Sequence, residues 1–82
     1  MELKTTKLWW ESKKNNRDIT HMLIVHSGTD FHDFPDWAQG KSDLREKCER
    51  YHESRHELLE IYTYDKKFEE QNGGYSVSEF TR

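Results

Sequence analysis

The stretch Ile19-Thr20-His21-Met22-Leu23-Ile24-Val25-His26 has the clearest strand pattern in the chain. Alternate side chains of an extended chain point to opposite faces, so Leu23 and Val25 share one face while Ile24 lies on the other. Apolar residues on both faces are typical of a strand that is covered on both sides, in contrast to a strand at a solvated edge. The pattern predicts a central strand of a sheet, ended by Gly28.

The residues before this stretch predict a partner strand and a turn. Residues 4–11 are rich in types that favour strands, namely Thr5, Thr6, Leu8, Trp9 and Trp10. Residues 12–17 are polar and include two adjacent asparagines, which tolerate the backbone conformations of turns. We therefore expect an N-terminal β-hairpin. Its two adjacent tryptophans would point to opposite faces, which leaves one of them outside a single core.

Residues 29–40 hold a unit of Asp, aromatic residue and spacer that occurs three times. The copies are Asp30-Phe31-His32, Asp33-Phe34-Pro35 and Asp36-Trp37-Ala38. A period of three matches a polyproline II or 3₁₀ backbone, on which the carboxylates line one side and the aromatic rings another. The segment is therefore predicted to be an acidic-aromatic connecting loop, whose rings either fasten it to the core or anchor a partner.

From residue 41 onward the pattern first indicates a helix. Ser42 or Asp43 is a suitable N-cap, and neither Gly nor Pro follows before Gly73. An apolar stripe at helical spacing consists of Leu44, Cys48, Tyr51, Leu58 and Tyr62. One main helix is therefore expected in this half of the chain.

Two interpretations cover the chain after residue 57. In the first, the helix ends there, and a strand over about 58–68 pairs through a turn at Asn72-Gly73 with a last strand. In the second, one long C-terminal helix runs from about 42 to 71. The first is favoured because Ile61-Tyr62-Thr63-Tyr64 is a poor helical run. The predicted fold class is α+β, with the order β-β-α-β-β.

Length and composition predict one small domain, residues 1–82, with a marginal, aromatic-rich core. Hydrophobic residues make up 32% of the chain, and eleven of its 82 residues are aromatic. Such a core gains stability from a partner or a homodimer. The single cysteine and the lack of a leader-like start favour a cytoplasmic location, the host cytoplasm if a phage encodes the protein. The longest apolar run, Met22–Val25, is too short for a membrane span, so no membrane association is expected.

Charge is distributed unevenly along the chain. Residues 1–17 hold five basic and two acidic side chains, although the net charge of the whole chain is −3. A basic hairpin with tryptophans predicts, as an alternative function, a nucleic-acid-binding module in which rings stack on bases and cations contact phosphates. The residues assigned to it are Lys7, Trp9, Lys13, Lys14 and Arg17. The acidity of the whole chain argues against this alternative, since such domains are usually basic.

A second alternative is a small metal-dependent enzyme. Cys48, His52 and His56 recur every four residues on the predicted helix and are weak candidates for metal ligands. The first and third would lie about 12 Å apart along the helix axis, too far for one coordination shell. The acids of the repeat also lack a phosphate clamp, because no basic residue lies between Gly28 and Gly40. We therefore predict a protein that is not an enzyme and needs no cofactor.

The favoured prediction is protein binding. A small chain without a catalytic motif suits an accessory or inhibitor protein encoded by a phage or mobile element. Its expected target is a host nucleic-acid-handling or defence protein. Aromatic anchors would supply the contact energy and carboxylates would orient the partner. The residues expected to contact the partner are Asp30, Phe31, Asp33, Phe34, Asp36, Trp37 and Trp10.

Overall fold

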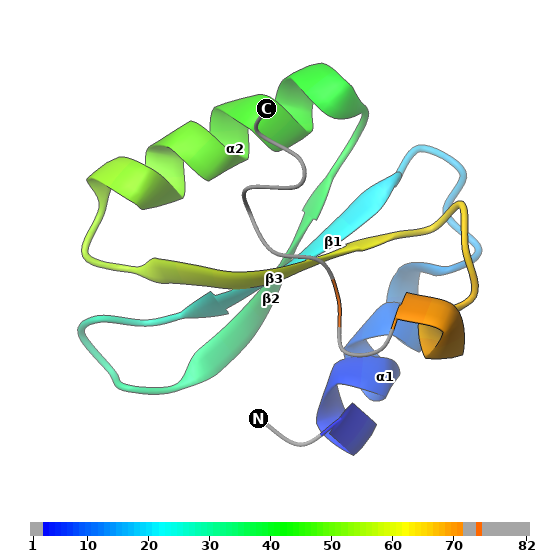
Figure 1. The fold of residues 1–82 in the computed structure, drawn as a ribbon, viewed down its shortest axis with the longest axis horizontal. Helices are drawn as coiled ribbons and strands as arrows, with labels where there is room; N and C mark the ends of the chain where they lie inside the picture. Colours follow the sequence, from blue (N-terminus) through cyan, green and yellow to red (C-terminus); the bar gives the residue numbers. More distant parts are fainter. Residues whose placement is uncertain (1–2, 72–73, 75–82) are drawn as a thin grey trace.

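A computed structural model describes residues 3–71 and 74, and these residues form three antiparallel strands and two α-helices (Figure 1). In chain order the elements are α1 (Leu3–Lys13), β1 (His21–His26), β2 (Asp33–Ala38), α2 (Lys41–Glu53), β3 (Glu57–Thr63) and the short 3₁₀ helix η1 (Phe68–Gln71). The predicted α+β class is confirmed. The predicted order β-β-α-β-β is roughly consistent with the structure, although a helix stands at the predicted first strand and β2 lies in the predicted loop.

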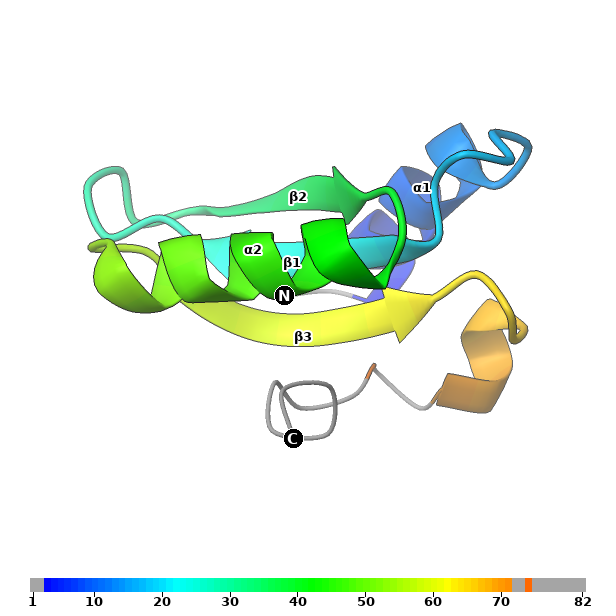
Figure 2. The ribbon, with the colours of Figure 1, turned by 90° about the horizontal axis from the view of Figure 1, so that it is seen from above.

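The sheet has the order β2-β1-β3, with β1 antiparallel to both neighbours. The predicted central strand is confirmed, and Met22, Leu23 and Val25 are completely buried in it. Figure 2 shows that α2 runs along the strands, whereas α1 and η1 lie at the end of the sheet where β2 and β3 finish. The β1–β2 loop and the connection from α2 to β3 lie at the opposite end.

The first core lies between α2 and the sheet. Its buried residues are Leu23, Val25, Ala38, Leu44, Cys48 and Ile61, and Phe34, Tyr51 and Leu58 pack against them. Leu44, Cys48 and Tyr51 recur at helical spacing, which gives α2 one apolar face to bury. The helix begins after Gly40, whose φ of 93° suits glycine, so the expected N-cap at residue 42 or 43 is wrong.

The end of α2 decides between the two interpretations of the C-terminal half. α2 ends at Glu53, and the Ser54 N–H and hydroxyl both donate to the Tyr51 carbonyl, so the long helix is wrong. β3 follows but stops at Thr63, where the Gln71 side chain accepts the Thr63 N–H at 2.8 Å and donates to its carbonyl at 2.9 Å. The expected turn at residues 72–73 and the strand after it lie outside the described residues.

The second core lies on the other face of the sheet. Its buried residues are Trp10, Met22, Ile24, Tyr62 and Phe68, and Trp9, Trp37, Leu59 and Tyr64 pack against them. Residues 4–11 contribute to this core as part of α1, so the predicted first strand and its hairpin are wrong. On a helix Thr6 and Trp10 share a face, and both are buried, whereas Leu8 is 65% exposed. Burial of Trp10 thus overrides the strand propensity of the individual residues.

The acidic-aromatic segment is a strand where a loop was expected. Residues 33–38 form β2, which pairs with β1, so its side chains alternate between the faces of the sheet with a period of two. Phe34 and Asp36 contact α2 or its core, whereas Trp37 packs in the second core. The expected division into a carboxylate side and an aromatic side is therefore wrong.

The free energy of unfolding is expected to fall when the pH drops below the ordinary histidine pKa. His21 is 8% exposed, and burial lowers its pKa below 6.5, against the opposing influence of Asp65. The unfolded chain binds this proton more tightly, so stability is greatest above pH 6.5 and decreases as the pH falls through that value. Urea titrations between about pH 5 and about pH 8 should show a shallower decrease in His21→Asn. An unchanged slope in that variant would contradict this assignment.

Candidate functional site

The β1–β2 loop and the α2–β3 connection lie side by side at one end of the sheet, on the left in Figure 1. The Gly28 N–H donates to His56 Nδ1 over 3.1 Å. A Cβ at position 28 would lie 2.0 Å from the Arg55 carbonyl oxygen. Glycine is therefore needed here because two backbones approach closely.

Hydrogen bonds order the β1–β2 loop around Ser27. Its N–H donates to the His32 carbonyl at 2.8 Å, and its own carbonyl accepts the Phe31 N–H at 3.1 Å. The Ser27 hydroxyl oxygen accepts the N–H groups of Thr29 at 3.3 Å and Asp30 at 3.1 Å. The loop is thus a hydrogen-bonded turn that holds Phe31 near its tip.

Phe31 combines two unfavourable features in this turn. The residue is 79% exposed, and its φ is 56°. The left-handed region costs a residue with a Cβ about 1–2 kcal/mol, and bulky residues rarely occupy it. Strained backbone of this kind is concentrated at binding and catalytic sites, where the surrounding structure maintains it. Phe31 is the leading candidate for a contact residue, and Asp30 and His32 beside it are also exposed.

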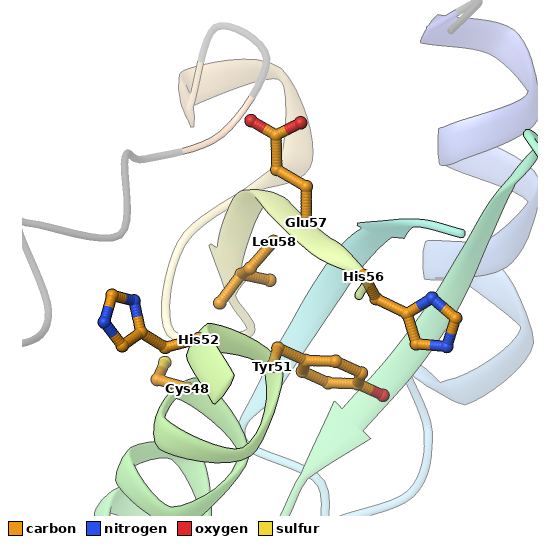
Figure 3. Close-up of a pocket in the computed structure, with 6 residues that line it drawn as sticks. All are labelled: Cys48, Tyr51, His52, His56, Glu57 and Leu58. Carbon is orange, nitrogen blue, oxygen red and sulfur yellow. The ribbon is translucent and has the colours of Figure 1, made fainter. Parts of the chain in front are cut away.

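A hollow of about 290 Å³ opens near this loop, between the last turn of α2 and the start of β3 (Figure 3). Its lining residues are Cys48, Tyr51, His52, His56, Glu57 and Leu58. The Phe34 ring of β2 lies edge-on to His56, with centroids 5.6 Å apart, and to Tyr51, at 6.4 Å. Two residues that line the hollow, Tyr51 and His56, therefore form an aromatic cluster with Phe34 of β2.

The expected ladder of Cys48, His52 and His56 on one helix is wrong, because α2 ends at Glu53 and His56 lies beyond it. Figure 3 shows the His52 and His56 rings on opposite sides of Tyr51. Within residues 3–71 and 74, no three His, Cys, Asp or Glu side chains lie close enough to hold a metal ion. Burial raises the pKa of the Cys48 thiol, which disfavours the nucleophilic thiolate.

Asp36 is held between β2 and α2. The Tyr51 hydroxyl donates to its Oδ2 at 2.6 Å, and Lys47 Nζ donates to its Oδ1 at 3.2 Å. Burial by itself raises the pKa of Asp36, but the hydrogen bonds from Tyr51, the Trp37 N–H and Lys47 together lower it below 3.8. The ionised carboxylate is therefore a structural connection between the sheet and the helix.

The residues expected to contact a partner differ in exposure. Asp30 and Phe31 are exposed, whereas the half-buried members of the set are Asp33, Phe34, Asp36 and Trp37. Asp33 Oδ1 also lies 2.8 Å from His26 Nδ1. Trp10 is 6% exposed in the second core, so its expected position outside the core is wrong. Of the three copies of the repeat, the first is therefore the most exposed to solvent.

The basic residues of the nucleic-acid alternative lie on α1 and just after it. Lys7 pairs with Glu69 at 2.8 Å, and Lys14 pairs with Glu11 at 2.5 Å. Of the remaining residues in that set, Lys13 Nζ lies 5.4 Å from the centroid of the Trp37 ring, Trp9 is half-buried and Arg17 is exposed. Three of these four cations thus have partners within the chain, and a helix replaces the expected hairpin platform.

Two features of this end of the molecule were not predicted from the sequence. The Gly28–His56 contact joins segments 28 residues apart, and it depends on where α2 ends. The positive φ of Phe31 depends on the hydrogen bonds of the turn. A usable signal was present in Ser27-Gly28-Thr29-Asp30, a cluster of turn-forming residues between two segments of strand-like composition.

Comparisons with protein-family models, curated proteins and solved structures found no match to this chain. In the described ranges, no helix has the length and apolar character needed to cross a membrane. We therefore infer function from the geometry and chemistry of the residues themselves.

Proposed function

We propose that the protein binds another protein through its β1–β2 loop, with Phe31 as the anchor. The observation that supports this most is the 79% exposure of Phe31 on a backbone with a φ of 56°. An aromatic ring that is exposed in the free protein gains a large buried area when it enters a pocket of a partner. Because hydrogen bonds already order the loop, binding costs little additional conformational entropy.

Charged groups near Phe31 favour a partner with a basic rim around its pocket. Asp30 is exposed beside Phe31, and Glu53 and Glu57 are exposed at the same end, together with the cation Arg55. Carboxylates at the rim of an interface steer and orient a partner of opposite charge more than they add affinity. This chemistry suits an accessory or inhibitor protein whose target has a basic surface, as nucleic-acid-handling proteins do.

The groups around the neighbouring hollow support binding in preference to catalysis. The Tyr51 hydroxyl donates to Asp36, and burial raises the pKa of this phenol. Burial raises the pKa of the Cys48 thiol as well. Both groups are thus held in their neutral forms by packing, whereas an activated nucleophile needs a lowered pKa or an adjacent base.

Replacing Phe31 by Ala is expected to weaken partner binding by about 30-fold or more, because anchor residues contribute about 2 kcal/mol or more. The partner is first captured from the cells that make the protein, with a photo-crosslinking phenylalanine analogue at position 31. Titration calorimetry with the purified partner then gives the Kd of each variant. Leu8→Ala is the matched control, since it removes an apolar side chain that is 65% exposed on α1, and its Kd should equal that of the wild type.

Two outcomes would count against this proposal. A folded Phe31→Ala variant with the wild-type Kd shows that the ring is not an anchor, and equal losses in Phe31→Ala and Leu8→Ala show that the effect is not local. Binding of labelled oligonucleotides that weakens steeply with salt, and that depends on Lys13 and Arg17, would favour the nucleic-acid alternative instead.

A further inference from the structure

The outer edge of β2 is formed by alternate residues of the acidic-aromatic repeat. Among the residues that the structure describes, β2 is the terminal strand on its side of the sheet. The Ser27 N–H donates to the His32 carbonyl, so the backbone groups of His32 face β1. From this pair onward, successive residues of β2 direct their backbone N–H and carbonyl groups alternately away from β1 and toward it. The residues whose backbone groups face β1 are Phe34, Asp36 and Ala38, and those whose groups face outward are Asp33, Pro35 and Trp37.

At two of these three outward positions, a backbone group that a further strand would need is either missing or already hydrogen-bonded. Pro35 has no N–H to donate. At Trp37 both backbone groups are occupied, because the N–H donates to Asp36 Oδ1 at 2.8 Å and the carbonyl accepts a hydrogen bond from Lys47 Nζ. Proline and lysine at sheet edges are devices by which natural proteins avoid edge-to-edge pairing.

Contacts with α2 fix the side chains that occupy the backbone groups of Trp37. The Tyr51 hydroxyl donates to Asp36 Oδ2, and Lys47 Nζ lies 3.2 Å from Asp36 Oδ1. The side chains of Lys47 and Asp36 are 18% and 28% exposed, so water screens this ion pair less than it screens a surface pair. Lys47 and Tyr51 are four residues apart on α2, and the same helix face therefore sets both contacts.

We propose that Pro35, Asp36 and Lys47 prevent β2 from pairing with the β2 strand of a second copy of this chain. An antiparallel two-fold pairing centred on Pro35 places the two prolines opposite each other and Asp33 opposite Trp37. The central pair then lacks both of its hydrogen bonds. Each flanking pair needs the Trp37 N–H and carbonyl, which are already occupied. The pairing therefore lacks its central hydrogen bonds, and its flanking ones must compete with the hydrogen bonds that Trp37 already makes within the chain.

In its other properties, β2 resembles a strand that pairs with an identical strand. A second copy of this chain is therefore the partner that these residues exclude. Phe34 and Trp37 are aromatic residues that favour strands. The net charge of −3 gives modest repulsion between copies. In the two-fold register centred on Pro35, the two prolines lie opposite each other, and each Trp37 lies opposite Asp33 of the other copy. The second and third copies of the repeat thus have a common role, which is to keep the edge of the sheet from pairing.

Opening this edge is expected to produce a dimer. Pro35→Val restores the central N–H, Lys47→Met frees the Trp37 carbonyl while it keeps an unbranched side chain, and Asp36→Ala frees the Trp37 N–H. Sedimentation velocity should give the triple variant twice the mass of the wild type over the same range of protein concentration. Pro35→Val/Lys7→Met is the matched control, because Lys7 pairs with Glu69 instead, and it should keep the wild-type mass.

A cross-link locates the contact. In Pro35→Cys/Asp36→Ala/Lys47→Met the two introduced thiols, one from each copy, face each other across the two-fold axis, so mild oxidation should give a disulfide-linked dimer. A folded Pro35→Val/Asp36→Ala/Lys47→Met variant with the wild-type mass overturns the proposal. It is also overturned by a dimer that does not cross-link at position 35, or by a wild-type protein that already pairs through β2.

Hydrogen exchange decides the matter if the triple variants do not fold. The Trp37 amide should exchange about tenfold faster in Asp36→Ala than in the wild type, relative to the Leu23 amide in β1, because it loses a hydrogen bond to a charged group. Equal relative exchange in the two proteins shows that Asp36 does not hold the Trp37 N–H, which overturns the proposal.

Discussion

Trp10→Ala is expected to lower the free energy of unfolding by about 3–5 kcal/mol, the range for truncating a buried large aromatic residue. The Trp10 ring stacks on Tyr64 with centroids 3.9 Å apart and meets Tyr62 edge-on at 6.1 Å. It also contacts Phe68 at 5.7 Å, so its loss opens a cavity where α1 and η1 join the sheet. A chain of this length has a total stability of about 4–12 kcal/mol, so the loss is about a quarter of the total or more, and at the lower end of that range it unfolds the protein.

Trp9→Ala is the matched control, because the same side chain is removed one position earlier. Trp9 is half-buried at the margin of the second core, and we expect a loss of about 1 kcal/mol. Urea denaturation followed by circular dichroism measures both variants without relying on tryptophan fluorescence. Similar losses at the two positions would mean that α1 does not direct Trp10 into the core.

The parts of the fold that were predicted correctly depend on local patterns. β1 is covered on both faces, and its continuous apolar run from Met22 to Val25 shows this directly. α2 carries a stripe of Leu44, Cys48 and Tyr51 that needs no knowledge of its neighbours. The break between α2 and β3 was also indicated, because Ile61-Tyr62-Thr63-Tyr64 is unsuited to a helix.

The parts that were missed depend on contacts between distant segments. Residues 4–11 have strand propensity, yet they form a helix because Thr6 and Trp10 are both buried in that conformation. In the repeat, the period of three is a property of composition, whereas pairing with β1 imposes a period of two. For the site, the repeat predicted the three rings as a group and left open which of them is exposed, and in the structure this ring is Phe31. The Gly28–His56 contact that supports its loop was not visible in the sequence.

Gly28→Ala is expected to lower the free energy of unfolding by about 1–3 kcal/mol, the usual cost of forcing atoms into a packed site. The added Cβ would lie 2.0 Å from the Arg55 carbonyl oxygen and 2.8 Å from its carbon. These are backbone atoms, so the two connections must move apart, and the Gly28 N–H then loses its bond to His56 Nδ1. Urea denaturation measures the loss, and the chemical shift of His56 Nδ1 reports the broken contact.

Gly40→Ala separates this clash from the general effect of replacing a glycine. A Cβ at position 40 meets nothing within 4 Å, but φ is 93°, so the cost there is backbone strain of about 1–2 kcal/mol. Both variants should therefore lose stability, while a changed His56 signal is expected in Gly28→Ala alone. Because the Phe31 turn begins at Ser27, Gly28→Ala should also weaken partner binding, and Gly40→Ala should not. If Gly28→Ala keeps the wild-type stability and the wild-type His56 signal, the two connections are not packed together, and nothing beyond its own hydrogen bonds holds the loop that presents Phe31.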